Sequence, residues 1–198
     1  MHQPVTMTSK EYHTPVLLKE CIEALKIDPE GIYADVTFGG GGHSKEILKK
    51  VTTGKLFGFD QDKDAYESGL KDERFVLIKK NFRFLKSSLS DLGVKEIDGL
   101  LADLGVSSHQ FDSAERGFSI RFDGKLDMRM NQKEGVTAAD ILNDYDELQL
   151  KLIFREFGEV ENAGHLAKII CETRKSKRIE TTEQLKTAIK KCVRKDKE

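Results

Sequence analysis

The stretch Tyr33–Lys50, YADVTFGGGGHSKEILKK, places four consecutive glycines between an apolar run and a segment with helical spacing. The apolar run is typical of a buried strand, which we expect to end at Phe38, with a helix from His43 onward. Glycine adopts positive φ readily and carries no Cβ, so Gly39–Gly42 would let a ligand lie against the main chain. In parallel α/β sheets, nucleotide ligands bind where the first strand meets a helix. A tight turn without a ligand is the alternative.

The glycine loop differs from two well-known phosphate-binding loops. The pattern GxxxxGK[ST] is absent, and counting from Gly39 or Gly40 leaves GxGxxG without its last glycine. Acidic residues, Asp60 and Asp103, end the second and fourth predicted strands, and a carboxylate there accepts hydrogen bonds from ribose hydroxyls. This combination suits S-adenosylmethionine better than NAD, because S-adenosylmethionine has no pyrophosphate for a helix N-terminus to hold.

The first half of the chain alternates strand-like and helix-like segments. We predict strands at 31–38, 54–60 and 74–82, and a fourth strand that runs into a loop over 97–108. Helices are predicted at 14–25, 43–51, 63–71 and 82–93. Short apolar runs separated by helices predict a parallel sheet covered on both faces.

The second half has a different pattern. Residues 109–135 carry few periodic apolar positions and are predicted to form a long ordered loop. Helices are predicted at 137–144, 146–158, 163–175 and 181–195, with Thr137 as an N-cap. In the second of these, one apolar face is predicted from the spacing of Leu148, Leu152, Phe154 and Phe157. We therefore divide the chain into an α/β half, 1–107, and a loop and helical half, 108–198.

Composition excludes several classes of protein. The 198 residues suit one domain with an insertion, and no run of 18 apolar residues or secretory leader is visible. Three cysteines without a CxxC pair fit a reduced cytosolic protein, and the histidine spacing predicts no metal site. From His165 onward, 11 Lys and Arg face 5 Asp and Glu, a local excess of 11 − 5 = 6. Solvated helix faces and a phosphate-facing patch both explain this excess.

Several motifs together carry a resemblance to a known family. HTPVLLKE, GIYADVTFGGGGHS, GFDQD, IDGLLADLGVSSHQFDSAERGFS and GKLDMRM occur in that order. The chain thereby resembles the bacterial 16S ribosomal RNA cytosine-N4 methyltransferases from about His13 to its end, more weakly over the helical half. The resemblance implies a Rossmann-like class I methyltransferase sheet with a helical insertion domain that recognises RNA. It also implies S-adenosyl-L-methionine as cofactor, a cytosine in the decoding region of 16S rRNA as substrate, and a cytoplasmic location without membrane attachment.

Site residues carry over from the resemblance onto matching positions. Those implied to contact the cofactor are Gly41, Gly42, His43, Asp60, Phe82, Asp103 and Gln110. Asp60 would hold the ribose and Phe82 would lie beside the adenine. For His43 a solvent-facing ring is the alternative, and for Phe82 a place in the core.

Asp103 is the candidate catalytic residue, because an acceptor near cytosine N4 can orient the amine and take its proton. DLGV stands here instead of the (D/N/S)PP(Y/F) of many amino-methyltransferases. C5 methylation would require a cysteine nucleophile on a loop, and all three cysteines fall in predicted helices.

The segment ERGFSIRFDGKLDMRM, 115–130, mixes arginines with aromatic residues. Arg116, Arg121 and Arg129, with Phe118 and Phe122, suit gripping phosphates and stacking an extruded base. A surface loop held by internal salt bridges is the alternative.

Members of the resembling family are longer and continue into strands that complete the sheet. We therefore expect an incomplete sheet with the fourth strand as an open edge, which a homodimer or exchanged element would cover. Two further hypotheses stay open: a non-catalytic module that binds cofactor or rRNA, and a nucleotide-dependent oxidoreductase.

Overall fold

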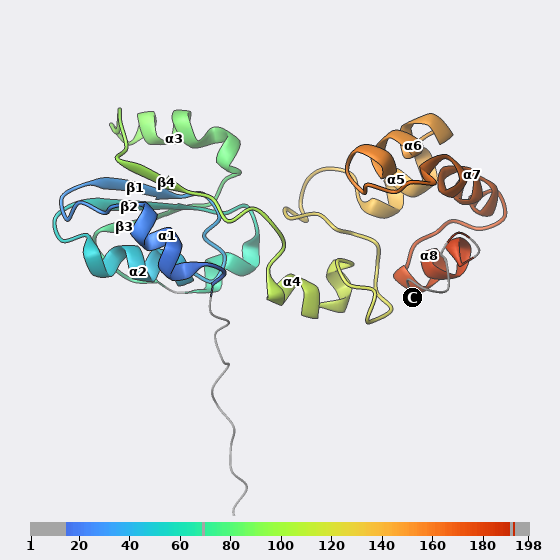
Figure 1. The fold of residues 1–198 in the computed structure, drawn as a ribbon, viewed down its shortest axis with the longest axis horizontal. Coiled ribbons are helices and arrows are strands. Elements are labelled where there is room, and N and C mark those ends of the chain that lie inside the picture. The colour runs from blue at the N-terminus through green and yellow to red at the C-terminus, as the bar shows by residue number, and fades with distance from the viewer. Residues whose placement is uncertain (1–14, 69, 191, 193–198) are drawn as a thin grey trace, which may run out of the picture. The chain divides into compact units, whose positions relative to one another are not determined.

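The computed structural model describes residues 15–68, 70–190 and 192, which form two compact units. Unit 1 runs to Gly105 and unit 2 begins at Val106 (Figure 1). This boundary lies two residues before the predicted end of the α/β half at 107. The functions of the two halves remain predictions.

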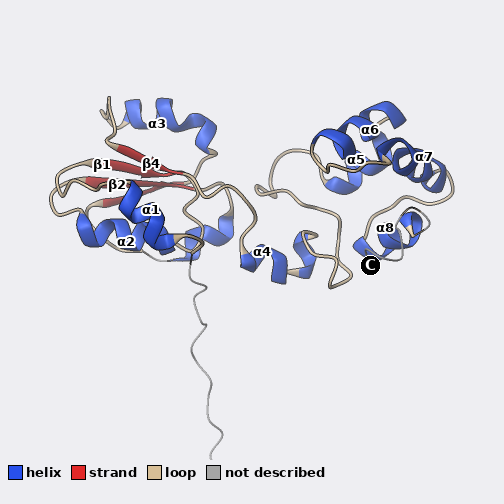
Figure 2. Ribbon diagram, in the orientation of Figure 1, coloured by secondary structure: helices blue, strands red, loops and turns tan. Residues whose placement is uncertain are grey.

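Unit 1 is built on a four-stranded parallel sheet in the order β3-β2-β1-β4, drawn as arrows in Figure 2. The strands are β1 Ile32–Asp35, β2 Lys55–Phe59, β3 Phe75–Ile78 and β4 Gly99–Leu101. All four predicted strands are confirmed, as is the Rossmann-like fold class. The predicted end of the first strand at Phe38 is wrong, because β1 ends at Asp35, although the N–H groups of Val36 and Phe38 still donate to Leu101 and Phe59.

Helices cover both faces of this sheet, α1 and α2 on one and α3 on the other (Figure 1). They are α1 Leu18–Ala24, α2 Gly42–Lys50 and α3 Leu85–Asp91, with 3-10 helices at Lys63–Ser68 (η1) and Phe82–Phe84 (η2). Leu56 and Phe57 of β2 point to opposite faces and are both buried, as expected for a central parallel strand.

The predicted α-helix at 63–71 is wrong, since only the 3-10 helix Lys63–Ser68 forms there. Two aspartates, Asp60 and Asp62, form the turn that leads into it. Oδ1 of Asp60 accepts from the backbone N–H of Asp62, and Oδ1 of Asp62 accepts from that of Asp64. Such side-chain bonds offer the backbone an alternative to helical pairing.

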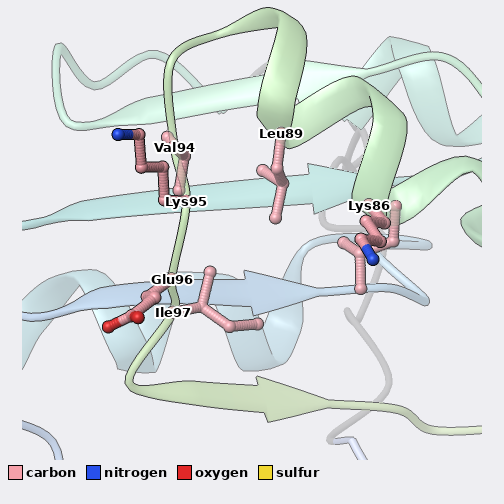
Figure 3. A pocket seen from close by; sticks show the side chains of 7 residues that line it. Lys86, Leu89, Val94, Lys95, Glu96 and Ile97 are labelled. Carbon is pink, nitrogen blue, oxygen red and sulfur yellow. The ribbon is translucent and has the colours of Figure 1, made fainter.

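β4 is an edge strand among the described residues, and Leu100 in its middle is 44% exposed. A pocket lies nearby under α3 and the segment that links it to β4 (Figure 3). Its lining residues are Leu85, Lys86, Leu89, Val94, Lys95, Glu96 and Ile97. None of them belongs to the strand-end loops described below, so we do not take this pocket as the functional site. Dimerisation across the β4 edge remains a prediction.

Unit 2 consists of helices around a small core of its own. The helices are α4 Ser108–Asp112, α5 Ala138–Asp144, α6 Glu147–Glu156, α7 Ala163–Arg174 and α8 Thr182–Ile189, with a 3-10 turn at Ala114–Arg116 (η3). The buried core residues are Leu126, Leu142, Leu150, Ala167, Ile170 and Ile179. Thr137 caps α5 as predicted, in a reciprocal capping box with Asp140. No helix within the described ranges is long and apolar enough to cross a membrane.

Two predictions for unit 2 are corrected. The segment 109–135 is not only a loop, because it contains most of α4 and all of η3. The apolar face predicted for α6 is confirmed only at Phe154, which packs against the core; Leu148, Leu152 and Phe157 are 63%, 50% and 85% exposed, whereas Leu150 is fully buried. Within the described part of unit 2, α6 buries only a narrow stripe against α7, and that stripe runs through Leu150.

Candidate functional site

The loops at the carboxyl ends of the four strands are joined to one another by side-chain hydrogen bonds. Each pair of neighbouring strands contributes one bond, of 2.7–2.9 Å: Asn81 to Gln61 between β3 and β2, Asp60 to Gly39 between β2 and β1, and Thr37 to Asp103 between β1 and β4. The row follows the strand order of the sheet. It fixes the edge at which parallel α/β sheets bind ligands.

The positions of the loop require glycine for different structural reasons. Gly39 and Gly41 have φ of 51° and 74°, a region that other residues rarely adopt. A Cβ on Gly41 would also lie 2.9 Å from the ring of Phe38. A Cβ on Gly42 would overlap Pro15, so this glycine is required by the chain segment that precedes α1. The tight-turn alternative therefore accounts for part of the run.

The loop leads directly into the N-terminus of α2, which begins at Gly42 and has no side-chain cap. The first backbone N–H groups of a helix lack intrahelical partners, so those of Gly42 and His43 are available to an acceptor. The His43 ring is 5% exposed, and its Nε2 donates to the carbonyl oxygen of Val16 at 3.2 Å. The solvent-facing alternative for this ring is wrong. Its side chain instead holds the segment before α1 against the glycine loop.

Asp60 bridges the glycine loop and the turn after β2. Its Oδ2 accepts from the backbone N–H of Gly39 at 2.8 Å, and its Oδ1 accepts from that of Asp62 at 2.8 Å. A carboxylate has about four acceptor positions, so the group retains capacity for a ligand hydroxyl. Burial is the main cause that raises the pKa of Asp60, and the two backbone hydrogen bonds oppose it. Added donors from a ligand would favour the ionised form further.

Asp35 is a buried carboxylate at this edge that the sequence analysis did not single out. It is 1% exposed; its Oδ2 accepts from Ser44 Oγ at 2.7 Å, and its Oδ1 accepts from the N–H of Thr37 at 3.2 Å. Burial raises its pKa, and the bond from Ser44 lowers it. The hydrogen bond between Asp35 and Ser44 joins the end of β1 to α2, on the two sides of the glycine loop in the sequence. The sequence does contain a signal for this pair: an acidic residue at the end of a buried strand, followed by a serine in the next helix.

Phe82 and Asp103 both have exposed side chains. Phe82 starts η2 and is 44% exposed, so the core alternative for this residue is wrong. Asn81 caps that turn through its side chain and also donates to Gln61, which fixes the backbone beside Phe82. The N–H of Asp103 donates to Thr37 Oγ1 at 2.7 Å, and its carboxylate is left facing outward.

Gln110 differs from the other candidates because it belongs to unit 2. It is 6% exposed, and its amide oxygen accepts from the N–H of Ser107 in a capping box at the start of α4. Its amide nitrogen donates to the sulfur of Met130 at 3.1 Å. The other six candidates all lie in unit 1.

Most of the arginines in the segment 115–130 are used inside unit 2. Arg116 is 1% exposed and donates to the carbonyl oxygen of Arg129 at 3.1 Å, with its guanidinium 5.7 Å from the ring of Phe118. Arg129 forms a two-pronged pair with Asp127, at 2.9 and 2.7 Å. For Arg116 and Arg129 the structure therefore supports the internal alternative.

The basic stretch after His165 is also partly satisfied internally. Arg174 donates to the carbonyl oxygen of Leu142 at 2.6 Å, and Arg178 pairs with Asp144 at 3.0 Å. These two side chains connect α7 and the segment after it to α5, and the side chain of Arg178 remains 53% exposed.

Comparisons with known proteins agree on one family. The model of the MraW methylase family matches residues 10–198. A protein of Christiangramia forsetii named ribosomal RNA small subunit methyltransferase H is 55% identical over 97% of this chain and 64% of its own length. Proteins with the same name from Flavobacterium johnsoniae and Bacteroides fragilis are 56% and 52% identical, over 93% and 90% of this chain.

These alignments cover 61% and 59% of those two relatives, so the chain spans about 60% of the length of the curated relatives it matches. The oxidoreductase hypothesis is not supported, because the named relatives are methyltransferases. Since the family model spans nearly the whole sequence, the chain belongs to the MraW methylase family.

Proposed function

We propose that unit 1 binds S-adenosyl-L-methionine and that the protein methylates N4 of a cytosine in the decoding region of 16S rRNA. The observation that carries the proposal is the bonded row of strand-end loops. It places the uncapped start of α2 and the Asp60 carboxylate at one edge of the sheet. The cofactor would supply an electrophilic methyl group on a sulfonium.

Each part of such a cofactor has a matching group in unit 1. The N–H groups of Gly42 and His43 would donate to its amino-acid carboxylate, as helix N-termini do for anions. Asp60 would accept from the ribose hydroxyls through its remaining lone pairs. The exposed ring of Phe82 would lie beside the adenine.

Asp103 would act on the substrate amine. The lone pair of cytosine N4 is delocalised into the ring, so an acceptor that orients the amine and takes its proton assists the transfer. The exposed carboxylate of Asp103 would do this, while the bond from its N–H to Thr37 holds its backbone. Gln110, from unit 2, stays a proposed cofactor contact on the strength of the motif match, and unit 2 is proposed to recognise RNA.

Calorimetric titration with S-adenosylmethionine tests the cofactor half of this proposal. We expect saturable binding that weakens about ten-fold or more in Asp60→Asn, because a hydrogen bond to a charged acceptor is lost. Asp91→Asn, at the exposed end of α3, is the matched control and should bind like the parent. Equal binding by Asp60→Asn would remove Asp60 from the site.

The same titration has a predictable pH dependence. The ribose would be held by ionised Asp60, so affinity falls as the pH drops through the pKa of this group. Burial raises that pKa above the ordinary 3.8, so the loss sets in at a higher pH than for an exposed aspartate. Asp60→Asn should abolish this dependence. A parent protein whose affinity is constant down to pH 4 would contradict the assignment.

A non-catalytic module that binds cofactor or rRNA is the second candidate, because the chain spans only about 60% of its relatives. Radiolabelled methyl transfer to unmodified small ribosomal subunits separates the two candidates. Incorporation at a single cytosine would exclude the second. Cofactor binding without incorporation would favour it.

A further inference from the structure

Three consecutive residues of unit 2, Ile120, Arg121 and Phe122, form an exposed tip in the segment between η3 and α5. The side chains of Ile120 and Phe122 are 73% and 49% exposed. In the sequence, two large exposed apolar residues therefore flank a cationic residue at this tip. Exposed apolar surface of this kind commonly marks an interaction site.

The tip is anchored on both sides. Before it, Ser119 is 8% exposed and its Oγ accepts from the backbone N–H of Arg121 at 3.2 Å. After it, Thr182 Oγ1 at the start of α8 donates to the carbonyl oxygen of Phe122 at 2.8 Å. The same hydroxyl accepts from the N–H of Gly124 at 3.1 Å. The two bonds at Thr182 join residues that are 60 and 58 positions apart in the sequence. They hold the backbone of the tip in place and leave its side chains on the surface.

Arg121 differs from its neighbours in how its charge is used. Arg116 lies buried under backbone carbonyls and Arg129 is paired with Asp127. The guanidinium of Arg121 contacts no acceptor in the part of the chain that the structure describes, and only its backbone N–H is bonded. It is therefore the arginine of this segment whose charge is available to an anion.

We propose that the tip Ile120–Phe122 is a contact for single-stranded RNA, with a base stacked on Phe122 and a phosphate held by Arg121. This inference rests on the proposed function and names where unit 2 meets its RNA. A cation beside an exposed aromatic ring matches the chemistry of an unpaired nucleotide, which offers a flat π-face and an anion within a few ångströms of each other. A purely apolar protein surface would leave the charge of Arg121 without a partner.

Fluorescence anisotropy with a short fluorescein-labelled oligocytidine tests the tip directly. Phe122→Ala and Phe122→Leu should weaken binding about ten-fold, because leucine keeps the apolar contact and loses the stacking face. Phe122→Trp should retain the parent affinity. Arg121→Ala should also weaken binding, and should reduce the slope of log affinity against log salt by about one.

Matched controls come from the same unit. Phe157, just after α6, is 85% exposed, so Phe157→Ala removes a more accessible phenylalanine that lies away from the tip in sequence. Lys177→Ala removes an exposed cation from the basic stretch after α7. Both should bind oligocytidine within about two-fold of the parent. The tip side chains are exposed, so thermal unfolding of every variant should match the parent and exclude misfolding as the cause.

The outcomes separate this inference from the proposed function. Parent binding that the tip variants leave unchanged, or no binding of oligocytidine by the parent, overturns the inference. Sedimentation in which Phe122→Ala dissolves a self-associated form would also overturn it, in favour of a protein interface. Titration of the same samples with S-adenosylmethionine reports on the cofactor site alone. Loss of cofactor binding with retained, tip-dependent RNA binding would count against the function and leave the tip intact.

Discussion

The buried carboxylates at the glycine-loop edge of unit 1 and two carboxylates of unit 2 are held in opposite ways. In unit 1, burial raises the pKa of Asp35 and Asp60, which depend on a hydroxyl and on backbone N–H groups for their hydrogen bonds. In unit 2, the side chain of Arg129 lowers the pKa of Asp127, and the hydroxyl of Thr137 lowers that of Asp140. Unit 1 thus keeps acidic groups in an environment that favours further donors, as a binding site would. Asp127 and Asp140 of unit 2 are held by side-chain donors instead, as is Asp72 of unit 1, which pairs with Arg74 away from that edge.

The same contrast separates the arginines of unit 2 from one another. Arg116 and Arg129 hold the backbone of the segment 115–130, whereas Arg121 is left to the solvent. Residue type alone does not distinguish them. Burial and hydrogen-bond partners do distinguish them. Arg116 and Arg129 support the fold of the segment, and Arg121 is a candidate RNA contact.

The largest expected effect on stability comes from removing the side chain of the buried arginine, Arg116. Arg116→Ala should destabilise unit 2 by about 3 kcal/mol, because it removes a packed side chain and leaves the carbonyl oxygens of Arg129 and Met130 without their donor. Arg121→Ala should change the stability by less than about 0.5 kcal/mol. Urea unfolding combined with hydrogen exchange of each unit measures both. Equal effects would remove the distinction between the two arginines.

Backbone geometry provides a second pair of variants in unit 2. Gly117 has a φ of 72°, and a Cβ there would overlap the carbonyl oxygen of Lys125. Gly117→Ala should therefore cost about 2–3 kcal/mol, from strain and overpacking together. Gly135 has a similar φ of 82° and nothing near its Cβ position, so Gly135→Ala should cost only about 1 kcal/mol. Similar unfolding midpoints for the two variants would mean that the backbone around Gly117 relaxes to accommodate the added Cβ, and would contradict this prediction.

In unit 1, Ser44→Ala tests the buried partner of Asp35. The variant should lose about 1–2 kcal/mol, because the carboxylate keeps its burial and loses its hydroxyl donor. Ser90→Ala, on the exposed side of α3, should be neutral within about 0.5 kcal/mol. A shift of cofactor affinity in Ser44→Ala alone would extend the role of this pair from stability to the shape of the glycine loop.

The smallest expected effect is the pH dependence of unit 2. A carboxyl whose pKa is lower in the folded than in the unfolded protein stabilises the fold above its unfolded value, which is near 3.8 for Asp127. That stabilisation is lost as the pH falls from about 3.8 through the folded pKa. Asp127→Asn should flatten the acid limb of the stability curve for unit 2. In unit 1 the raised pKa of Asp35 has the opposite sign, so its protonation favours the fold. An acid limb for unit 2 that is unchanged in Asp127→Asn would contradict this prediction.

The sequence predicted the elements whose signals are local. The strands of unit 1 follow from short apolar runs that are buried on both faces, and the cap of α5 follows from Thr137 and Asp140 three residues apart. The glycine loop and Asp60 could be placed at one edge because parallel strands bring their carboxyl ends together. The motif order identified the family, which the family model then confirmed.

What the sequence could not supply depends on contacts between distant residues. Leu148 and Leu150 are chemically alike, and only the docking of α7 decides that Leu150 is buried and Leu148 exposed. Gly42 is required by Pro15, a neighbour that lies 27 residues earlier in the chain.

The amino-acid sequence thus determined the fold class, the family and the edge of the sheet where the candidate site lies, because periodicity, glycines and motifs act over a few residues. Tertiary structure alone decided how each polar group is used. It joined Thr37 to Asp103, buried Asp35 with Ser44, and left Arg121 free while Arg116 was enclosed. Hydrogen bonding and burial are properties of neighbours in space, and those neighbours exist only after the chain has folded.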